Sequence, residues 1–344
     1  MKYHFSITPR TLHFKQPAGT SRGVYTTRQS WLIEATSDSL PGIKGIGECA
    51  PLPDLSCDAK PGYADTLQQI CRMTELAGGI NYSMLRPYPS MLFGLETAIT
   101  DLENGGSGLL FDTPFARGEE GIRINGLVWM GRYDEMLARL EQKMNAGYRC
   151  VKLKIGAIDF ESELELVRHI RQAFGKDRIE LRVDANGGFT PDEAPARLEQ
   201  LARYDIHSIE QPIRQHQWAR MAELCASTPI PIALDEELIG VNMTQMKQDL
   251  LDRIRPQYII LKPSLHGGMH GTREWIDMAG ARGIGSWITS ALESNVGLNA
   301  VAQLAAHIYG PDIHMPQGLG TGQLFTDNIP MPLEISGDKL WRRP

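Results

Sequence analysis

The sequence predicts an α/β fold in which a closed parallel barrel of the TIM type follows a small α+β domain. The length of 344 residues corresponds to about two domains. From residue 122 onward, short β-branched runs alternate with longer amphipathic stretches, which indicates repeated βα units. Before that point, strand-like segments come first and helix-like segments follow, an order typical of an α+β domain. An open doubly wound sheet is the alternative for the larger part.

The first third of the chain contains candidate strands and helices. Residues 3–14 alternate loosely between apolar and polar, and residues 30–35 are apolar, so both are expected to be strands. Residues 15–27 are rich in Gly, Ser and Thr, and we expect a mobile loop there that closes over the functional site. Apolar residues at three- and four-residue spacing predict helices over 62–76 and 90–104.

The middle of the chain contains strand-like runs separated by stretches of helical periodicity, such as residues 133–145 and 160–174. The expected strands are residues 122–129, 151–155, 179–184, 208–211, 230–235, 258–262, 285–290 and 312–315. We expect the barrel domain to cover residues 121–316 and the first domain to cover residues 1–120. The tail, residues 317–344, has no clear helix and is expected to pack back on the first domain.

Composition and charge exclude several classes of protein. Hydrophobic residues make up 42% of the chain and charged residues 22%, which argues against a disordered or collagen-like chain. The net charge is −6 and no run of Lys and Arg occurs, so neither a nucleic-acid surface nor an anionic-membrane surface is indicated. Composition thus excludes these partners without indicating one.

Cysteine usage and the apolar pattern indicate the compartment. The five cysteines are scattered without a CxxC pair, which fits reduced thiols in the cytoplasm better than disulfides or a zinc ribbon. The chain lacks the run of about 18 apolar residues that a membrane-spanning helix needs. Charged residues interrupt the first 15 residues, unlike a signal peptide. A soluble cytoplasmic protein is expected.

Ionisable residues occupy the ends of successive predicted strands. They are, in chain order, Lys154, Asp184, Glu210, Asp235 and Lys262, separated by 30, 26, 25 and 27 residues. Each separation is close to the length of one βα unit. These side chains are therefore expected at the carboxyl ends of neighbouring strands, where the active sites of barrel enzymes lie. The regular spacing favours a functional site over charges that only face solvent.

The charge pattern within these strands indicates a cation site. Side chains two residues apart on a strand share a face, so Lys152 lies beside Lys154 and Arg182 beside Asp184. If that face points into the barrel, cationic side chains flank three carboxylates, which repel one another unless a cation joins them. One opposite-charge pair at about 4 Å is worth about 4 kcal/mol at an effective dielectric constant of about 20. Carboxylates without His or Cys companions suit a hard cation such as Mg²⁺.

Specific motifs connect these features to a known family. The whole chain resembles the enolase superfamily in its muconate-lactonizing subgroup, through the Lys152-Leu153-Lys154 motif, the three strand-end carboxylates and Lys262. Within this subgroup the chain is similar to the o-succinylbenzoate synthase family. Three stretches support that narrower resemblance: GECAPLP at 47–53, SALESNVG at 290–297 and GLGTGQLF at 318–325.

The resemblance implies a fold, a metal and a reaction. The implied fold is a modified (β/α)7β barrel with an N-terminal capping domain. Asp184, Glu210 and Asp235 are implied to bind Mg²⁺, with Mn²⁺ as a substitute. Lys154 is implied to be the general base and Lys262 to lie on the opposite face of a small carboxylate substrate, following the Lys base and Mg²⁺ pairing known for this superfamily. The implied reaction removes a proton α to a carboxylate and then eliminates water, as a step of menaquinone biosynthesis.

Further residues are weaker candidates for contacts with the substrate or with the ligand carboxylates. Asn186 and Glu236 follow two of the carboxylates, and Ser290 ends the seventh predicted strand, where it could hydrogen-bond a second substrate carboxylate. A glycine-lined loop could offer backbone groups, and a basic residue of the 15–27 segment could contact an anion. The complete weaker set is Lys152, Arg182, Asn186, Glu236, Ser290, Gly320, Gly322 and Arg22.

Other functions stay open on the sequence alone. Lys154 and Lys262 on opposite faces would also serve a two-base isomerase, either an N-succinylamino-acid racemase or a dipeptide epimerase. The glycines at 318–322, in place of an acidic pair, disfavour the epimerase. A muconate-type cycloisomerase and a noncatalytic binding protein on the same barrel are further alternatives. Monomer and self-associated dimer are equally compatible with the sequence.

Overall fold

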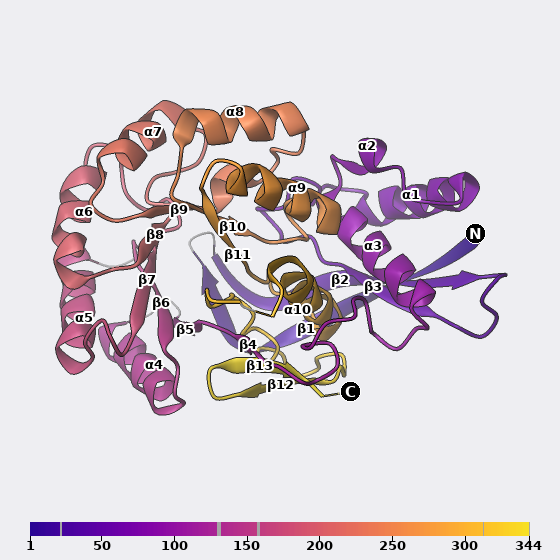
Figure 1. The fold of residues 1–344 in the computed structure, drawn as a ribbon, viewed down its shortest axis with the longest axis horizontal. Coiled ribbons are helices and arrows are strands. Elements are labelled where there is room, and N and C mark those ends of the chain that lie inside the picture. Colours follow the sequence, from indigo (N-terminus) through magenta and orange to yellow (C-terminus); the bar gives the residue numbers. More distant parts are fainter. Residues whose placement is uncertain (21–22, 129–131, 157–158, 312, 344) are drawn as a thin grey trace.

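The computed structural model describes residues 1–20, 23–128, 132–156, 159–311 and 313–343. Figure 1 shows two regions side by side. One is an antiparallel sheet with helices, built from the start of the chain, and the other is a curled parallel sheet with helices along its outer side. The molecule is an α/β protein, as the sequence predicts, and the ends of the parallel strands carry the candidate site.

The N-terminal region is an antiparallel sheet covered by helices. Its elements are β1 (Tyr3–Thr20), β2 (Gly23–Ser37), β3 (Gly45–Cys49), α1 (Tyr63–Ala77), α2 (Tyr82–Leu85) and α3 (Pro89–Glu103). The strand order is β1-β2-β3. Helix α3 lies so close to β3 that a Cβ atom on Gly47 would lie 1.9 Å from the carbonyl oxygen of Gly94, so this position requires glycine. Helices α1 and α3 agree with the two helices predicted for this region.

The segment 15–27 is not the loop that its composition predicts. Its described residues continue β1 and β2 as one antiparallel hairpin, with a register shift between His13 and Ala18. The composition wrongly predicts a loop here because each strand satisfies its backbone hydrogen bonds by pairing with the other. The polarity of neighbouring residues does not indicate such pairing. Arg22, the candidate anion contact, lies outside the described residues.

The parallel sheet occupies the middle of the chain. Its strands are β5 (Gly126–Val128), β6 (Cys150–Lys154), β7 (Glu180–Asp184), β8 (Ser208–Glu210), β9 (Ile232–Leu234), β10 (Tyr258–Leu261) and β11 (Gly285–Ile288). In the described part of the chain they pair in the order β11-β10-β9-β8-β7-β6-β5. Most positions of the central strands are buried Val, Ile, Leu and Ala residues, as expected for parallel strands covered on both faces.

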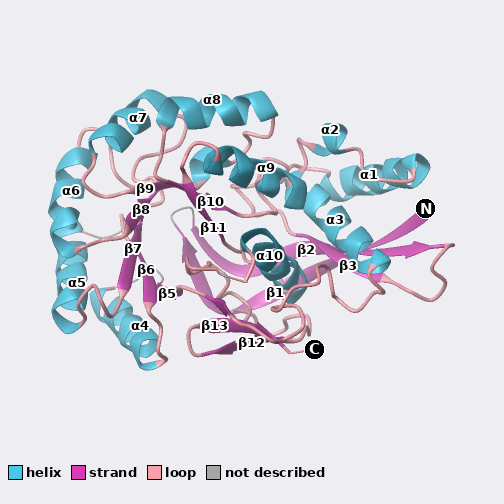
Figure 2. Cartoon of the chain, in the orientation of Figure 1, coloured by secondary structure: helices cyan, strands magenta, loops and turns pink. Residues whose placement is uncertain are grey.

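Helices alternate with these strands and form an outer arc, which Figure 2 shows in cyan. They are α4 (Tyr133–Asn145), α5 (Phe160–Ala173), α6 (Ala194–Leu201), α7 (Trp218–Ser227), α8 (Thr244–Ile254), α9 (Gly268–Gly280) and α10 (Asn295–Tyr309), with 3₁₀ turns η1 (Ala202–Tyr204) and η2 (Glu236–Leu238). Local caps begin some of them: Asp159 accepts from the amide of Ser162 at the start of α5. None of the described helices is both long and apolar enough to cross a membrane.

A short segment bridges the two edges of the curled sheet. Gln317 makes a parallel bridge to Ile124, just before β5, and Gly318 makes a parallel bridge to Thr289, just after β11. The amide of Gly318 donates to the carbonyl oxygen of Ile288 at 2.9 Å. This short segment therefore lies between the first and last strands of the curled sheet.

Two predicted strands of this region differ from the structure. The strand expected over 312–315 is wrong, because residues 313–315 form no strand and the bridges lie at 317–318 instead; Asp312 lies outside the described residues. The run 122–129 is divided between β4 (Ile122–Arg123), which joins another sheet, and β5. Its last residue, Trp129, also lies outside the described residues.

The C-terminal tail contacts both regions. The hairpin of β12 (Leu333–Ser336) and β13 (Lys339–Arg342) pairs through β13 with β4. The amide of Lys15 on β1 donates to the carbonyl oxygen of Leu324 at 2.8 Å, and the amide of Thr326 donates to that of His13 at 2.9 Å. The tail therefore forms hydrogen bonds with β1 of the first region and pairs with β4 at the start of the second.

Candidate active site

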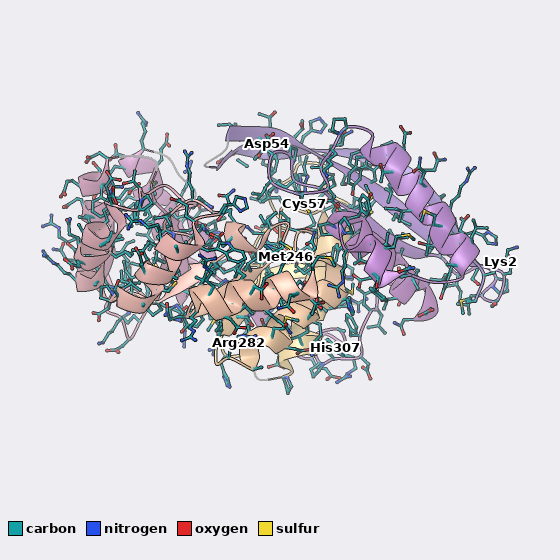
Figure 3. All side chains as sticks on the ribbon, turned by 90° about the horizontal axis from the view of Figure 1, so that it is seen from above. Lys2, Asp54, Cys57, Met246, Arg282 and His307 are labelled. Carbon is teal, nitrogen blue, oxygen red and sulfur yellow. The ribbon has the colours of Figure 1, made fainter. Side chains whose placement is uncertain are left out.

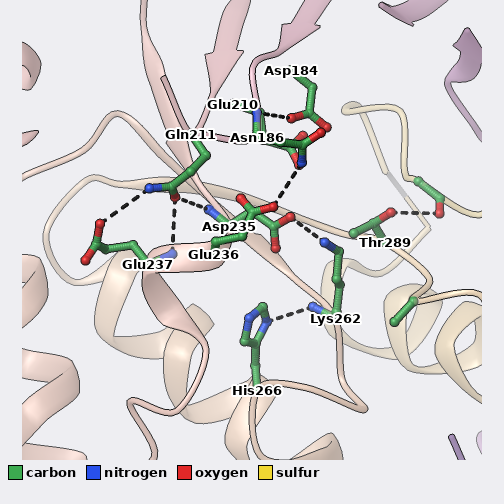
Figure 4. Close-up of polar contacts among 12 residues, drawn as sticks. Asp184, Asn186, Glu210, Gln211, Asp235, Glu236, Glu237, Lys262, His266 and Thr289 are labelled. Atoms are coloured by element: carbon green, nitrogen blue, oxygen red, sulfur yellow. Dashed lines mark hydrogen bonds and ion pairs between the residues drawn. The ribbon is translucent and has the colours of Figure 1, made fainter. Parts of the chain in front are cut away.

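The strand-end residues predicted from the sequence come together at one edge of the parallel sheet. Lys154, Asp184 and Glu210 are the last residues of β6, β7 and β8. Lys154 is the register partner of Asp184, and Asp184 is the register partner of Glu210. Asp235 directly follows β9 and Lys262 directly follows β10. Because these strands are parallel, the five side chains form one cluster, part of which Figure 4 shows.

A cavity lies over these strand ends. Its polar side includes Lys152, Lys154, Glu210, Glu236 and Lys262. Its apolar side is contributed largely by segments outside the parallel sheet, among them Tyr25, Leu52, Leu55, Leu292 and Leu324. Figure 3 shows Asp54 and Cys57, from the same segment as Leu52, and Cys57 contacts Asn242, which lies just before helix α8 of the parallel-sheet region. The cavity is therefore enclosed by both regions of the chain, with charged groups on one side and apolar groups on the other.

Lysine ammonium groups lie against the carboxylates. Lys152 Nζ donates to Asp184 Oδ2 at 3.0 Å and to Glu210 Oε2 at 2.8 Å. Lys154 Nζ donates to the same Asp184 oxygen at 2.9 Å. Lys262 Nζ forms a close ion pair with Asp235 Oδ2, marked in Figure 4. The Asp184 and Asp235 side chains are fully buried, whereas those of Lys154 and Lys262 keep 11% and 15% of their surface exposed. The lysines are thus the groups that a bound molecule can reach.

This packing of charges changes the proton affinities of the cluster. Burial opposes the charged form of Lys152 and Lys262, but the neighbouring carboxylates raise the pKa of both lysines above the ordinary value. Burial would raise the pKa of Asp184, yet Lys152 and Lys154 hold it well below its usual range. At Glu210, burial and then the charge of Asp184 raise the pKa well above the ordinary value. The present surroundings of Glu210 therefore oppose its charged form, and a further cation beside it would favour that form.

The donor atoms suit a hard divalent cation. Glu210 Oε1 and Asp235 Oδ1 are buried without a hydrogen-bond partner among the described residues, which is costly for a carboxylate oxygen. Oxygen donors alone match Mg²⁺ better than zinc. The described His, Cys, Asp and Glu side chains form no group of three or more with the arrangement of a metal site, and lysine ammonium groups lie between these carboxylates. The oxygen donors thus fit the implied metal by their chemistry. In this structure the carboxylates are paired with lysine ammonium groups.

Asn186 and Glu236 form a chain of hydrogen bonds that ends on Lys154. Asn186 Oδ1 accepts from Lys154 Nζ at 2.6 Å, and Asn186 Nδ2 donates to Glu236 Oε1 at 2.9 Å, as Figure 4 shows for the second bond. The backbone of Asn186 has φ +45°, a left-handed conformation that asparagine tolerates better than most residues. Asn186 therefore contacts Lys154 directly, and Glu236 is connected to Lys154 through Asn186.

Ser290 lines the cavity, but its hydroxyl proton is already used. Ser290 Oγ donates to Glu293 Oε2 at 2.7 Å and accepts from Thr321 Oγ1 at 2.8 Å. Glu293 also accepts from Ser264 Oγ at 2.5 Å and from the amide of Ala291 at 2.7 Å. A hydrogen bond from Ser290 to a substrate carboxylate would have to replace the bond to Glu293. Ser290 is therefore placed as part of a fixed network rather than as a free donor.

Arg182 lies away from the carboxylates that the sequence suggests it supports. Arg182 Nε donates to Glu180 Oε1 at 2.7 Å, and Nη1 donates to the carbonyl oxygen of Pro316 at 3.0 Å. Its guanidinium also lies 4.4 Å from the centre of the Trp287 ring. Glu180 is the first residue of β7, so the arginine points toward the start of its strand. Two-residue periodicity places Arg182 on the same face as Asp184 but does not give the direction of so long a side chain.

The two candidate glycines have different surroundings. Gly320 lines the cavity, as expected. Gly322 is not part of the cavity lining: its carbonyl oxygen accepts from Asn328 Nδ2 at 2.8 Å, and a Cβ atom there would lie 2.7 Å from Asn295 Oδ1. Close packing, rather than contact with a ligand, therefore accounts for glycine at position 322.

Two residues of the site have no role in the predictions from sequence. Gln211 Oε1 accepts from the amides of Asp235 at 3.3 Å and Glu237 at 3.2 Å, which ties the end of β8 to the end of β9 (Figure 4). His266 Nδ1 accepts from the amide of Lys262 at 2.9 Å, and burial lowers the pKa of His266 to about 3. Gln211 could have been noticed because it directly follows Glu210. No pattern in the sequence indicates that His266 contacts Lys262.

Comparison with known proteins identifies the family. Residues 135–337 match the model of the enolase C-terminal domain-like family, which is more than half of the chain. The chain therefore belongs to the enolase C-terminal domain-like family.

Individual proteins and solved structures are similar to this chain over nearly its whole length. The o-succinylbenzoate synthase of Desulfotalea psychrophila is 47% identical to this chain, and the alignment covers 96% of each protein. The crystal structure of MenC from Desulfotalea psychrophila superimposes with a TM-score of 0.85 at 42% identity, covering 99% of this chain and 100% of the other. A dipeptide epimerase from Enterococcus faecalis, complexed with Mg and the dipeptide L-Leu-L-Tyr, shares the fold at a TM-score of 0.78 and 19% identity, covering 99% of this chain and 100% of the other.

Proposed function

We propose that this chain is a Mg²⁺-dependent o-succinylbenzoate synthase of menaquinone biosynthesis. It would convert 2-succinyl-6-hydroxy-2,4-cyclohexadiene-1-carboxylate to o-succinylbenzoate with loss of water. The observation that carries the proposal is the entry of Lys154 and Lys262 into one cavity from strands on opposite sides of Glu210. The relative from Desulfotalea psychrophila, which bears this name at 47% identity, supports the choice of reaction.

Lys154 is the proposed general base. Removal of the proton α to the substrate carboxylate builds a second negative charge on that group, so the step needs both a base and nearby positive charge. Hydrogen bonds to Asp184 and Asn186 fix the direction of Lys154 Nζ at the cavity wall. In its neutral form Lys154 takes the α proton. Lys262 lies across the strand ends and stabilises the enediolate electrostatically, with the ring system as a further cation–π partner.

Elimination of water completes the proposed reaction. The bond between the ring carbon and the hydroxyl oxygen breaks, and its electron pair leaves with the oxygen. The proton held by Lys154 passes to that oxygen, so hydroxide departs as water and the base is restored. The remaining ring is aromatic, which drives the step forward. One lysine therefore suffices for both proton transfers, provided that the proton and the hydroxyl leave from the same face.

Asp184, Glu210 and Asp235 are the residues that would hold Mg²⁺. When bound, the cation would stabilise the charge that develops on the substrate carboxylate. The partnerless oxygens of Glu210 and Asp235 support this assignment, as does the Mg in the complex of the dipeptide epimerase that shares the fold. Gln211 directly follows Glu210, and its side chain accepts from the amide of Asp235, so it would keep these two ligands in place relative to each other.

We also infer the finer architecture and setting. The bridges of Gln317 and Gly318 to both sheet edges support a (β/α)7β barrel that includes these two residues and so extends just beyond the predicted limits of 121–316. Residues 1–120 and the rest of the tail up to residue 344 would then form the capping domain. The five free cysteines, four of them buried, agree with a cytoplasmic location, where thiols stay reduced.

A two-base isomerase is the second candidate, because Lys154 and Lys262 both reach the cavity. Proton NMR in deuterated water separates the candidates, with the cyclohexadiene substrate in one sample and an N-succinylamino acid in the other. The synthase produces aromatic signals in the first sample only when Mg²⁺ is present. An isomerase instead removes the α-proton signal in the second sample. Absence of aromatic product in the first sample, with Mg²⁺ and folded protein, would refute the proposed function.

A further inference from the structure

One buried arginine of the N-terminal region joins two loops that enclose the cavity. Arg28 lies on β2 and is 2% exposed. Its guanidinium carries five N–H groups, and among the described residues it has five carbonyl acceptors and no carboxylate acceptor. Nε donates to Leu292 O at 3.1 Å, Nη2 to Ala50 O at 2.5 Å and Ala291 O at 3.4 Å, and Nη1 to Pro51 O and to Gln29 O at 3.3 Å.

Four of these acceptors belong to segments that form the cavity wall. Ala291 and Leu292 line the cavity themselves, and Leu52 comes directly after the two acceptors of the other loop. Tyr25, three residues before Arg28 on the same strand, lines the cavity as well, and its hydroxyl donates to the carbonyl oxygen of Pro53 at 3.2 Å. One side chain thus sets the separation of the loop at 50–53 from the loop at 290–294.

The conformation of Leu292 shows that the second loop is held under strain. Leu292 has φ +64°, in the left-handed region that a branched side chain rarely occupies. The amide of Leu292 donates to Ser290 Oγ at 3.1 Å, while its carbonyl oxygen accepts from Arg28. Such a conformation persists only where the surroundings fix it, and these two bonds hold both sides of the residue.

Glu48 fixes the next part of the same loop. Glu48 Oε2 accepts from Ser294 Oγ at 2.5 Å and from the amide of Gly297 at 2.9 Å. Glu48 lies on β3, so two neighbouring strands of the N-terminal sheet hold the loop between β11 and α10. The carboxylates of Glu48 and Glu293 also favour the charged form of Arg28, which burial alone opposes.

We infer that Arg28 is a positioning residue for the substrate: by holding the loops at 50–53 and 290–294 at a fixed separation, it sets the apolar wall that receives the ring of the substrate. This inference rests on the proposed function. The proposed base and metal ligands lie on β6 to β8 and directly after β9, outside the hydrogen bonds of Arg28. Loss of its contacts should therefore weaken binding of substrate more than it slows the chemical step.

The test compares Arg28→Lys with the wild-type chain. The single ammonium of lysine cannot reach acceptors on both loops in the fork geometry of a guanidinium. We expect KM for the cyclohexadiene substrate to rise about tenfold or more while kcat changes less than about threefold. Calorimetry should show a matching loss of affinity for o-succinylbenzoate, a measurement that does not depend on turnover.

Arg86→Lys is the matched control. Arg86 also joins the two regions, through Glu274 at 3.0 Å and the carbonyl oxygen of Asn242 at 2.8 Å, but it does not line the cavity and contacts neither loop. We expect Arg86→Lys to lower the thermal midpoint of unfolding and to leave KM within about twofold of wild type.

The outcomes separate the inference from the proposed function. Absence of turnover by the wild-type chain would refute the proposed function. Wild-type turnover with an unchanged KM and product affinity in Arg28→Lys would refute the role of Arg28. Equal changes of KM in Arg28→Lys and Arg86→Lys would refute it as well. Arg28→Gln, which keeps two N–H groups without the charge, serves if the lysine variant does not fold. Failure of both to fold would make Arg28 a folding residue and overturn the inference.

Discussion

Lys154 and Asp184 are register partners on β6 and β7, and a hydrogen bond of 2.9 Å joins Lys154 Nζ to Asp184 Oδ2. The same oxygen accepts from Lys152 at 3.0 Å. The proposed base and its neighbour Lys152 therefore both donate to one carboxylate oxygen of a proposed metal ligand. Substitution of either residue changes the surroundings of the other, so turnover and metal affinity need to be measured separately for each variant.

Replacement of Lys154 tests the general base. Lys154→Ala removes the group that takes the α proton, and we expect kcat to fall by about 10²–10⁴-fold. Calorimetric titration with Mg²⁺ should still show binding, because the carboxylates are intact. Retention of more than about one percent of wild-type turnover would contradict the assignment of the base.

Replacement of Lys262 tests whether its charge or its proton matters. In the synthase mechanism Lys262 acts only as a cation, so Lys262→Arg should keep a larger share of kcat than Lys262→Met, which we expect to lose about 10²-fold or more. The two variants are compared by the initial rate of product formation. Equal losses in both would indicate that proton transfer by Lys262 is required, as in a two-base isomerase.

Replacement of Glu210 tests the metal site. Glu210→Gln removes a charged ligand, and we expect the affinity for Mg²⁺ measured by calorimetry to fall by more than about tenfold. Glu237→Gln is the control, because Glu237 is also buried near the strand ends but accepts from the amide of His216 at 2.7 Å instead of lining the cavity. Unchanged Mg²⁺ affinity in Glu210→Gln would remove Glu210 from the ligand set.

The contact between α3 and α9 predicts a pH dependence of stability. Glu96 on α3 accepts from the amides of Met269 at 2.5 Å and His270 at 2.9 Å, and burial raises the pKa of Glu96 to about 8. The folded chain therefore keeps a proton on Glu96 that the unfolded chain releases once the pH exceeds the ordinary value. It follows that Glu96 makes the free energy of unfolding decrease as the pH rises from about 4.5 to about 8.

Glu96→Gln tests this dependence, because glutamine stays neutral at every pH. We expect the variant to gain stability relative to wild type when urea unfolding is repeated at about pH 9 instead of about pH 5. The difference between the two proteins at the lower pH measures the lost hydrogen bonding. An equal difference at both pH values would show that Glu96 does not titrate in this window.

The sequence was most informative where function places charges in apolar strands. Lys154, Asp184, Glu210, Asp235 and Lys262 could be found because charged residues at the ends of buried strands recur at the length of one βα unit. Their meeting in one cluster then follows from the parallel arrangement of the strands. The direction of Arg182 could not be found in this way, because a long side chain can turn toward either end of its strand.

Features set by long-range pairing were not predictable. The hairpin of β1 and β2 includes polar residues that suggest a loop, and only the pairing of the two strands makes them extended. Gln317 and Gly318 bridge the sheet edges without an apolar run that would mark a strand, so the last strand was expected a few residues too early. The contacts of Arg28 join two loops that are more than 230 residues apart in the chain, which the sequence does not reveal.

The central claim is that Mg²⁺ and Lys154 together support elimination of water from the cyclohexadiene substrate. The most direct test is the initial rate of increase in the ultraviolet absorbance of o-succinylbenzoate, measured for wild type and Lys154→Ala with Mg²⁺ and with excess chelator. We expect product formation only by wild type with Mg²⁺. Equal rates with Mg²⁺ and with chelator, or equal rates in wild type and Lys154→Ala, would contradict this claim.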